Sequence, residues 1–553
     1  MEYQEREENQ MEAQNRKPVE IQVRADESMG KQDRFWRYVG YDECNYTYMP
    51  EGKQLLNIFG GLEDAPYYVR THFMFCTGNC HGAYKFGSTN LYTEDEEGNP
   101  VFDFAFYDRI LDTQLQSGNK PFVELGFMPM DLADTSYGKG IKENWHDTYK
   151  NIGWTFPPKD YDKWHLLIET LAKHLLEKYG EEEINSWDFE LWNEPDIFYW
   201  SGSAAEYCKL YDYTEHAFHS VLPKARLSGP ATTGPFEGSS SQKFLRFFLE
   251  HCRDGANYYS QEKGTRLDFI TFHVKGGGFP FAVPARTKKE DPSVERLLLQ
   301  VKIGMDVVRE CGYGDREIVL SEADPDGWAA GGMYDNANMV FRNSEYYASY
   351  VASTYVGIEK LAMEYNMKVR PLAWAWTFPG ESCFEGTRAF TTQGIEKPVL
   401  HAFRMLARLG SEKVALESTG ASENTKEIPD ISGMAAKESA DPGAPLGILL
   451  YSHLEDRDAK GVTPVRLTIS GLEGGKVRVA RYAVDKEHSN GYEEWLRQGS
   501  PLYPDGEVYE AIRKKGLLEA PETEELAVSA DGTLSLEWEL PLHGVWFLSV
   551  ENI

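Results

Sequence analysis

Residues 187–196 read WDFELWNEPD, an aromatic and apolar run that carries a carboxylate, Glu194, between an amide and a proline. Large apolar side chains followed by an abrupt end at Pro195 are typical of a short buried strand. A buried carboxylate costs free energy unless a partner satisfies it or a reaction uses it. Glu194 therefore marks either an internal ion pair or a functional site at the end of a strand.

Seven other runs have the same β-rich character, and each ends in polar or glycine residues before a helical stretch. The eight runs cover residues 36–42, 67–73, 121–127, 186–194, 226–231, 268–274, 316–322 and 371–378. Residues 160–180, 204–222 and 343–365 place apolar side chains at helical spacing. Eight β–α units predict the α/β class and a (β/α)8 barrel, the TIM-barrel fold. A doubly wound open sheet is the alternative, but the glycine-rich phosphate loop that it usually carries is missing.

The character of the chain changes at residue 405. We assign residues 31–405 to the barrel and residues 406–553 to an accessory β-sandwich. Strand-like alternation occurs in residues 448–454, 465–471, 477–484, 534–540 and 545–551. The stretch 411–445 is turn-rich and is expected to be irregular. Residues 18–30 form a strand that could join the sandwich, and residues 1–17 are expected to be disordered or poorly ordered.

Composition and charge narrow the range of partners. With 57 basic and 88 acidic residues, the chain has a net charge of −31, which disfavours nucleic acid and anionic membranes but not a neutral ligand. No apolar run of about 20 residues predicts a transmembrane helix, and the N-terminal residues lack the apolar core of a signal peptide. Seven cysteines, a sparse and odd number, favour a reducing compartment. These features together favour a cytoplasmic protein.

Two acidic residues close strand runs that face each other across an eight-stranded barrel. Glu194 ends the fourth run and Glu322 the seventh, and such barrels build their active sites from the C-terminal ends of the strands. We therefore expect the two carboxyl groups to converge. Glycoside hydrolysis requires such a pair, one protonated and one ionised, although either acid alone is ordinarily a solvated or salt-bridged side chain. Asp324 and Asp326, just after Glu322, are interpreted as part of a turn.

The motif LWNEPD (191–196) resembles the Asn-Glu-Pro signature of the clan of retaining glycoside hydrolases built on (β/α)8 barrels. Further stretches are similar to family 39 of the glycoside hydrolases, and to its bacterial β-xylosidase-like branch in particular. They include FWRYVGYDECNYTY, YYVRTHF, KPFVELGFMP, LDFITFHVKG and LSEADPDG. That family contains β-xylosidases and α-L-iduronidases, and the resemblance covers residues 18–550.

The resemblance implies roles for individual side chains. It implies that Glu194 is the acid/base and Glu322 the nucleophile, the same pair that the strand-end argument selects. It also implies that Asn193 contacts the sugar and that His273, at the end of the sixth run, lines the subsite.

Further candidates for substrate binding come from the strand runs themselves. Glu124 could bind a sugar hydroxyl, but a supporting acid paired with Arg70 or His72 is an equally good interpretation. Arg70 and His72 alternate on one strand face and are expected to share one environment. Trp374 and Trp376 also share a face, so one could form the floor of the sugar site while the other belongs to the core.

We expect a retaining, exo-acting β-D-xylosidase that releases xylose from short xylo-oligosaccharides, as in xylan degradation; exo action follows from the resemblance. The expected partner is a neutral oligosaccharide or an aryl glycoside, and whether the chain forms a homo-oligomer stays open. An α-L-arabinosidase or a β-galactosidase is the alternative on the same scaffold. An α-L-iduronidase would need a basic residue for the sugar carboxylate. From another class, the rival is a non-catalytic carbohydrate-binding barrel, against which the two intact glutamates argue.

A possible metal motif, CTGNCH, groups Cys76, Cys80 and His81. The spacing C-x3-C-H is not a strong zinc pattern, and no second pair of ligands lies nearby. We therefore expect no metal and no organic cofactor, and we interpret this loop as part of the mouth of the pocket.

Overall fold

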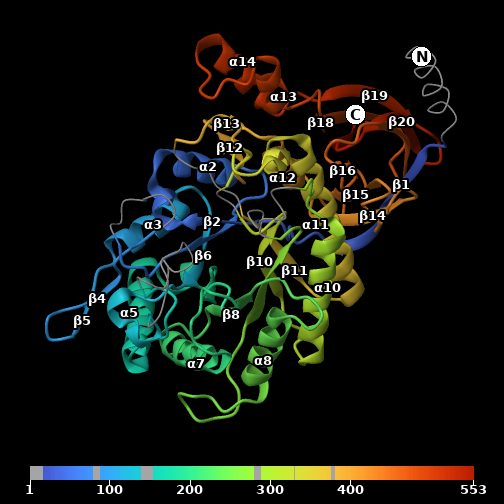
Figure 1. Ribbon diagram of the computed structural model, residues 1–553. Coiled ribbons are helices and arrows are strands. Elements are labelled where there is room, and N and C mark those ends of the chain that lie inside the picture. Colours follow the sequence, from blue (N-terminus) through green and yellow to red (C-terminus); the bar gives the residue numbers. More distant parts are fainter. Residues whose placement is uncertain (1–16, 79–86, 139–152, 279–287, 329–330, 375–379) are drawn as a thin grey trace.

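The computed structural model describes residues 17–78, 87–138, 153–278, 288–328, 331–374 and 380–553. It contains a closed barrel of parallel strands wrapped by helices and a second β-sheet domain beside it (Figure 1). The predicted fold class is confirmed. The expectation of disorder concerned residues 1–17, nearly all of which lie outside the described residues.

The barrel strands follow one another in sequence order around the closed sheet. They are β2 (Tyr38–Glu43), β3 (Tyr68–His72), β6 (Lys120–Leu125), β7 (Asp188–Leu191), β8 (Arg226–Thr232), β9 (Phe269–Lys275), β10 (Ile318–Asp324) and β11 (Val369–Trp374). Each lies within or overlaps one of the eight predicted runs, which confirms the β–α reading of the sequence. The fourth and seventh strands are thus β7 and β10.

Eight helices follow these strands and cover the barrel. They are α2 (Pro50–Gly60), α3 (Ala105–Gln116), α5 (Tyr161–Tyr179), α7 (Ala204–Val221), α8 (Ser240–Asp254), α10 (Val294–Glu310), α11 (Glu345–Tyr365) and α12 (Pro398–Ala407). Local chemistry sets their ends: Ser203 and Glu206 form a capping box at the start of α7, and Gly180, with φ of 79°, follows the last residue of α5.

Shorter elements complete the barrel domain. They are the hairpins β4 (Tyr92–Glu94) with β5 (Pro100–Phe102) and β12 (Thr391–Thr392) with β13 (Ile395–Glu396), the turn helix α6 (Glu181–Ile184), and the 3-10 helices η1 (Cys44–Tyr48), η2 (Met130–Leu132), η3 (Thr135–Gly138) and η4 (Ala337–Asn343).

The interior of the barrel is filled in layers. One layer is apolar and aromatic, and its buried members are Tyr38, Phe122, Phe269, Val319, Leu372 and Trp374. Because side chains alternate along each strand, the next inward positions toward the C-terminal ends carry polar groups. Gly40 on β2 leaves room for Trp374, since a Cβ there would lie 2.5 Å from the Trp374 ring. The polar layer is therefore supported by a closed apolar floor.

The second domain is a nine-stranded, mostly antiparallel sheet. In sheet order its strands are β19 (Glu522–Val528), β18 (Gly475–Val484), β21 (Val545–Asn552), β16 (Leu446–His453), β15 (Asp430–Lys437), β14 (Glu412–Ser418), β1 (Val19–Lys31), β17 (Val462–Ser470) and β20 (Leu534–Pro541). The sheet curls into facing layers, since β16 and β20 are in contact although four strands separate them in the sheet. Irregular register in β1 helps it bend.

Sequence and structure agree for part of this domain. The five predicted strand runs correspond to β16, β17, β18, β20 and β21, and β1 lies between β14 and β17. The prediction of irregular structure over residues 411–445 is wrong, because that stretch contains β14 and β15. Two helices that the sequence did not predict, α13 (Gly491–Arg497) and α14 (Gly506–Gly516), lie between β18 and β19.

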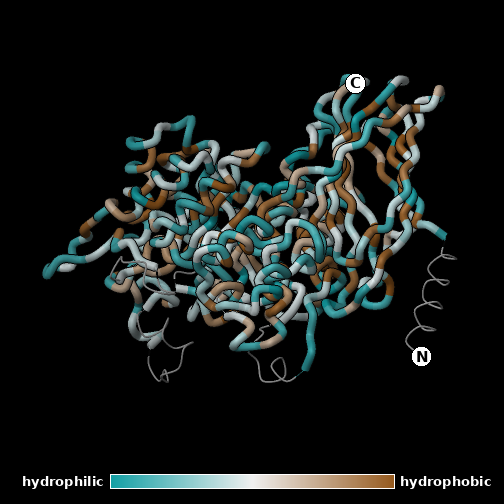
Figure 2. The backbone as a smooth tube through the Cα atoms, turned by 90° about the horizontal axis from the view of Figure 1, so that it is seen from above, coloured by the Kyte–Doolittle hydropathy of each residue, from teal (hydrophilic) through white to brown (hydrophobic). Residues whose placement is uncertain are grey.

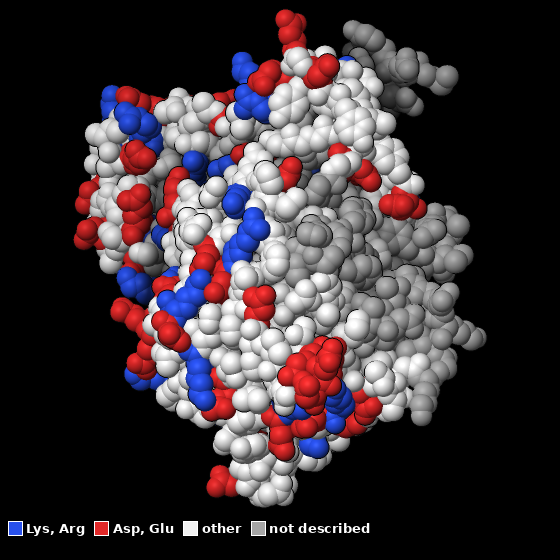
Figure 3. All heavy atoms as spheres, turned by 90° about the vertical axis from the view of Figure 1, so that its left-hand side faces the viewer, with Lys and Arg blue, Asp and Glu red and all other residues white. Residues whose placement is uncertain are grey.

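Hydrophobic segments run along the interior of both domains, and hydrophilic residues dominate the outer turns (Figure 2). On the face drawn in Figure 3, acidic and basic side chains are interspersed. Within the described ranges, no helix combines the length and apolar character needed to cross a membrane.

Two buried histidines lie where the second domain packs against α11. His453 ends β16 and His543 precedes β21, with ring centroids 5.7 Å apart. Ser349 Oγ of α11 lies 2.9 Å from His453 Nδ1 and 3.5 Å from His543 Nδ1. Burial lowers the pKa of His543 to about 4 and that of His453 well below its ordinary value. Both imidazoles are therefore neutral in the folded protein at pH 7.

We expect this interface to lose stability between pH 7 and pH 5. Unfolded histidine binds a proton at about pH 6.5, whereas folded His543 does so only near pH 4, so the unfolded state takes up more protons as the pH falls. For His543 alone the loss at pH 5 is about 2 kcal/mol. Thermal unfolding at both pH values should show a smaller drop in Tm for His543→Gln than for the wild type. His488→Gln, at a partly exposed histidine, is the control, and an equal drop in all three proteins would contradict the prediction.

Candidate active site

Glu194 stands in a strained turn just beyond β7. Trp192 and Glu194 adopt left-handed backbone conformations, with φ of 72° and 43°, which cost free energy and are retained where the surroundings enforce them. The Trp192 indole is buried and donates to the carbonyl of Tyr199 at 2.9 Å. The Glu194 N–H donates to the carbonyl of Ala231 on β8 at 2.9 Å. These contacts turn the Glu194 side chain inward, over the C-terminal end of the barrel.

The register of β9 and β10 brings Glu322 to the same place. Glu322 pairs with His273 along the two strands, after an irregularity that follows Leu320. His273 Nδ1 lies 2.9 Å from Glu194 Oε1 and 3.7 Å from Glu322 Oε2. One oxygen of each glutamate and a ring nitrogen of His273 lie within 4.8 Å of one another. The two carboxyl groups converge, as the strand-end argument predicts.

Arg70 is the hub of the buried polar layer. Its guanidinium donates to Glu190 Oε2 at 2.6 Å and to Asn193 Oδ1 at 3.1 Å, and it lies 3.3 Å from Glu322 Oε1 and 3.1 Å from Glu124 Oε2. Because Arg70 holds the Asn193 oxygen, the amide NH2 group is the part of that side chain left for a ligand; it has no protein partner among the described residues.

His72 couples a second acid to the pair. Its Nδ1 lies 2.5 Å from Glu124 Oε2, and its Nε2 lies 3.4 Å from Glu322 Oε1. Burial alone would lower the pKa of His72, but the Glu124 carboxylate raises it to about 10. His72 is therefore a cation beside Glu322. Glu124 pairs with both Arg70 and His72, the contacts that the interpretation as a supporting acid predicts.

The surroundings of Glu194 and Glu322 give the two side chains different protonation states. Burial and the charge of Glu322 raise the pKa of Glu194 to about 7. Burial would also raise the pKa of Glu322, but the positive charges around it, of His273 when protonated and of Lys275, lower it well below its usual range. Burial lowers the pKa of His273 to about 4, so the cations beside Glu322 near neutral pH are Lys275, Arg70 and His72. At pH 6 a protonated Glu194 thus faces an ionised Glu322.

Lys275 and Arg388 belong to the site, although the sequence analysis did not single them out. Lys275 Nζ lies 2.5 Å from Glu322 Oε2 and also contacts Asp324 Oδ2. Arg388 Nη1 lies 3.1 Å from the same Asp324 oxygen. Lys275 is two positions after His273 on one strand, so face alternation could have found it. Arg388 lies in an irregular loop, where no periodic pattern points to it.

The interpretation of Asp324 and Asp326 as part of a turn is wrong for Asp324 and holds for Asp326, which lies in the bend after β10 and accepts from the Trp328 N–H at 2.9 Å. Asp324 is the last residue of β10 and is buried between Lys275 and Arg388. Asp326 is also buried, and Arg342 binds both of its carboxylate oxygens at 2.7 Å. Both acids are charge partners inside the protein: Asp324 because the strand extends to it, and Asp326 because Arg342 reaches the bend that follows.

The tryptophan and cysteine candidates have mixed outcomes. Trp374 is buried beneath His72, with ring centroids 4.7 Å apart, so it forms the floor under the polar layer. Cys76 is a buried free thiol. Trp376, Cys80 and His81 lie outside the described residues.

The geometry also bears on metal binding. Glu194, His273 and Glu322 are the one group of such side chains, within the ranges that the structure describes, whose ligand atoms are close enough to hold an ion. Lys275, Arg70 and protonated His72 already surround Glu322. Their positive charge opposes a cation at this position, so the arrangement suits proton transfer and nucleophilic attack better than metal ligation.

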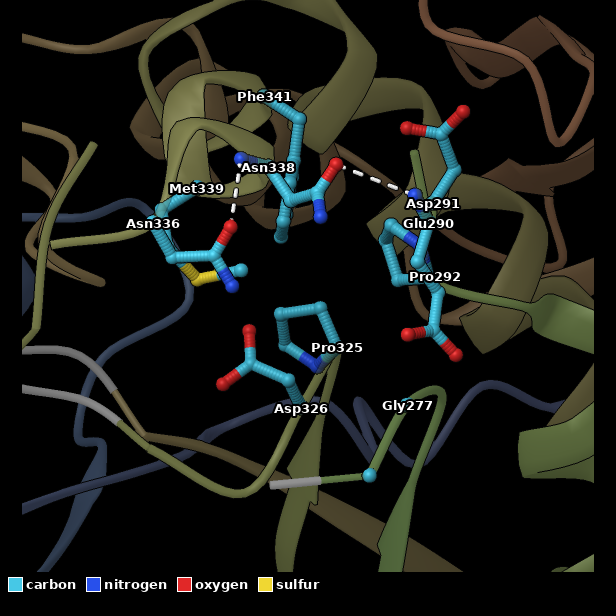
Figure 4. Close-up of a pocket in the computed structure, with 11 residues that line it drawn as sticks. Gly277, Glu290, Asp291, Pro292, Pro325, Asp326, Asn336, Asn338, Met339 and Phe341 are labelled. Atoms are coloured by element: carbon cyan, nitrogen blue, oxygen red, sulfur yellow. Dashed lines mark hydrogen bonds between the residues drawn. The ribbon is translucent and has the colours of Figure 1, made fainter. Parts of the chain in front are cut away.

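A small pocket lies between the loops that follow β9 and β10 (Figure 4). Gly277 and Pro325 line one side and Asn338 and Asp291 the other, around a volume of about 50 Å³. Neither Glu194 nor Glu322 lines this pocket, so it is separate from the space between the two carboxyl groups.

Comparison with known proteins shows the family of this chain. The sequence matches the family described as "Glycosyl hydrolases family 39" over residues 19–535. A β-xylosidase of Caldicellulosiruptor saccharolyticus is 26% identical over 473 residues, which cover 83% of this chain and 85% of that protein. An α-L-iduronidase of Mus musculus is 25% identical over 416 residues, which cover 70% of this chain and 62% of that protein. A crystal structure of a monomeric β-xylosidase from Caulobacter crescentus CB15 has a TM-score of 0.75 at 20% identity, covering 97% of this chain and 99% of that one. The chain belongs to glycosyl hydrolase family 39 and is a glycoside hydrolase.

Proposed function

We propose that this chain is a retaining, exo-acting glycosidase with Glu322 as nucleophile and Glu194 as acid/base. The observation that carries the proposal is the separation of the two carboxyl groups, whose nearest oxygens lie within 4.8 Å. Retaining enzymes hold their carboxyl groups about 5–5.5 Å apart, whereas inverting enzymes leave about 6.5–9.5 Å for a water molecule. The opposite pKa shifts of the pair support the same assignment.

The proposed reaction has two steps. Glu322 attacks the anomeric carbon and forms a glycosyl ester, while Glu194 gives its proton to the departing oxygen. Water then attacks the anomeric carbon of the ester and gives a proton to Glu194, and the bond from that carbon to Glu322 breaks, which releases Glu322 as a carboxylate. In this proposal the Asn193 amide donates to a sugar hydroxyl beside the reacting carbon. The sugar is released with its original anomeric configuration.

For the sugar itself we propose β-D-xylose, released from the end of short xylo-oligosaccharides. The support is the sequence relation to β-xylosidases, which extends over most of both chains. α-L-Arabinosides and β-galactosides are the alternatives, because a pentose and a hexose site differ by one hydroxymethyl group.

One side chain favours a second candidate, a uronic acid such as L-iduronate. Lys275 has three ammonium hydrogens, and Glu322 and Asp324 take two of them. The third ammonium hydrogen of Lys275 has no protein partner among the described residues and could be donated to a sugar carboxylate. Relatives named α-L-iduronidase make this chemistry relevant to the family. The basic residue that a uronidase needs is thus available, although two acids already share its charge.

Aryl glycosides of xylose, arabinose, galactose, glucose and iduronic acid test the proposal together. We expect kcat/KM for the β-D-xyloside to exceed that for each other sugar by about tenfold or more. The first product, observed by NMR before mutarotation, should have the substrate's configuration. An inverted product would refute the assignment of Glu322 as nucleophile.

The second candidate predicts a different ranking. If the iduronide is the best substrate, Lys275→Gln should lower kcat/KM for the iduronide about tenfold more than for the xyloside, because only the uronate loses a charge-assisted contact. Equal losses on both substrates would argue against a uronate site. If none of the five glycosides is hydrolysed, the proposed sugars are wrong.

A further inference from the structure

The helices α13 and α14 pack away from the sheet that they interrupt. Together with their connection they form the insert (residues 491–516), which lies above the barrel beside β12 and β13 (Figure 1). Its apolar side chains share one buried cluster with the barrel domain: Tyr492, Trp495 and Ile512 from the insert, and Cys383, Phe384 and Ile395 from the barrel. The second domain thus covers residues 380–397, which we call the Arg388 loop.

The insert binds the Arg388 loop on both sides of Arg388. The carbonyl of Leu502 accepts from the Cys383 N–H at 2.8 Å and from Gln393 Nε2 at 3.0 Å. The Tyr509 hydroxyl donates to the carbonyl of Gln393 at 3.0 Å. One carbonyl of the insert therefore joins positions five residues before and five residues after Arg388. The insert acts as a clamp across the base of this loop.

The barrel holds the same loop from within. Lys397 Nζ donates to the carbonyl of Thr387 at 3.1 Å. Arg388 is buried and donates to the carbonyl of Asp326 at 2.7 Å as well as pairing with Asp324. The position of the guanidinium thus depends on anchors from both domains, and the insert supplies the outer one.

A short chain of charges leads from Arg388 to the reacting carboxylate. Asp324 pairs with Arg388 and Lys275, and Lys275 also binds Glu322. If Arg388 withdraws, Asp324 loses one of its two cations, and its uncompensated charge draws the Lys275 ammonium away from Glu322. Glu322 would then bind a proton more readily. The other titratable or charged groups that face Glu322 stay in place: Arg70 and His72 from β3, His273 from β9, and Glu194 beyond β7.

We propose that the insert of the second domain is a positioning element of the active site, which keeps Lys275 directed at Glu322 through the Arg388 loop and Asp324. The proposal rests on the proposed role of Glu322 as nucleophile. Gln393 and Tyr509 are positioning residues in this scheme, because neither contacts the reacting groups.

The double variant Gln393→Met/Tyr509→Phe tests the clamp, because it removes side-chain donors with little change in size. Arg513→Gln, at an exposed ion pair on α14, is the matched control. With an activated aryl glycoside, we expect kcat/KM of the double variant to fall about 10- to 100-fold. The acidic limb of its pH profile should move up by about one pH unit, because Glu322 becomes easier to protonate. The control should match the wild type.

Hydrogen exchange separates this inference from the proposed function. The double variant should exchange faster in peptides from the Arg388 loop and from residues 318–326, which include Glu322, while Tm changes little. An unchanged acidic limb in an active enzyme would overturn the inference, even if the loop itself exchanges faster. If the wild type hydrolyses no aryl glycoside, the proposed function fails. Hydrogen exchange of residues 318–326 in the double variant then tests the positioning role by itself. Exchange equal to that of the wild type would overturn that role.

Discussion

Replacing Glu322 with alanine is expected to lower kcat/KM for an activated aryl glycoside by about 10⁴-fold or more, because the proposed reaction forms its glycosyl ester on this carboxylate. Glu322 is ionised and held by Arg70, His72 and Lys275. Alanine removes the nucleophile, while Arg70, His72 and Lys275 keep their other carboxylate partners, Glu190, Glu124 and Asp324. The measurement is initial-rate kinetics on the best substrate of the glycoside panel.

Two comparisons make the result for Glu322 specific. Glu250→Ala, at an exposed position on α8, should retain wild-type kinetics. Circular dichroism should show that Glu322→Ala is folded. More than about one hundredth of wild-type activity in a preparation free of wild-type enzyme would show that Glu322 is not the nucleophile.

The second large effect is expected for Glu194→Ala, and it should depend on the leaving group. A poor leaving group needs the proton from Glu194, so its kcat/KM should fall about 10²- to 10⁴-fold. A dinitrophenolate leaves without protonation, so formation of the glycosyl ester from its glycoside should change much less. The ester should then accumulate, because Glu194 no longer activates water. Added azide should restore turnover and yield a glycosyl azide of retained configuration.

The pH profile adds an independent test of Glu194. Since its pKa is raised to about 7, the proton needed by the leaving group is present below that pH and lost above it. For the wild type we expect kcat/KM to decline on the alkaline side with an apparent pKa near 7. In Glu194→Ala this decline should disappear. An identical alkaline limb in both proteins would assign it to another group.

Local sequence patterns were sufficient to predict the barrel. Each barrel strand is a short β-rich run followed by a helix whose apolar positions recur at helical spacing, and both patterns are properties of neighbouring residues. The same reasoning failed for β14 and β15, because residues 411–445 are rich in turn-forming residues. β14 is stabilised by pairing with β1, which is distant in sequence, and β15 by pairing with β16, which lies outside the stretch 411–445.

The candidate site divides in a similar way. Strand ends identified Glu194 and Glu322, and the family resemblance added Asn193 and His273. The alternation of side chains along β9 could have identified Lys275, two positions after His273, but this residue was not predicted. No local sequence pattern could have identified Arg388, because it lies in an irregular loop and meets Asp324 only in the folded protein.

By itself, the sequence determined the order of strands and helices and which acids stand at strand ends, because these depend on local periodicity and on the direction of parallel strands. Only the tertiary structure decided which charges meet. Burial, the register of β9 with β10 and the cations around Glu322 set the distances between ionisable groups, and those distances decide which glutamate holds a proton. Folding also brings an insert of the second domain against the loop that carries Arg388, and the residues in this contact are more than one hundred positions apart.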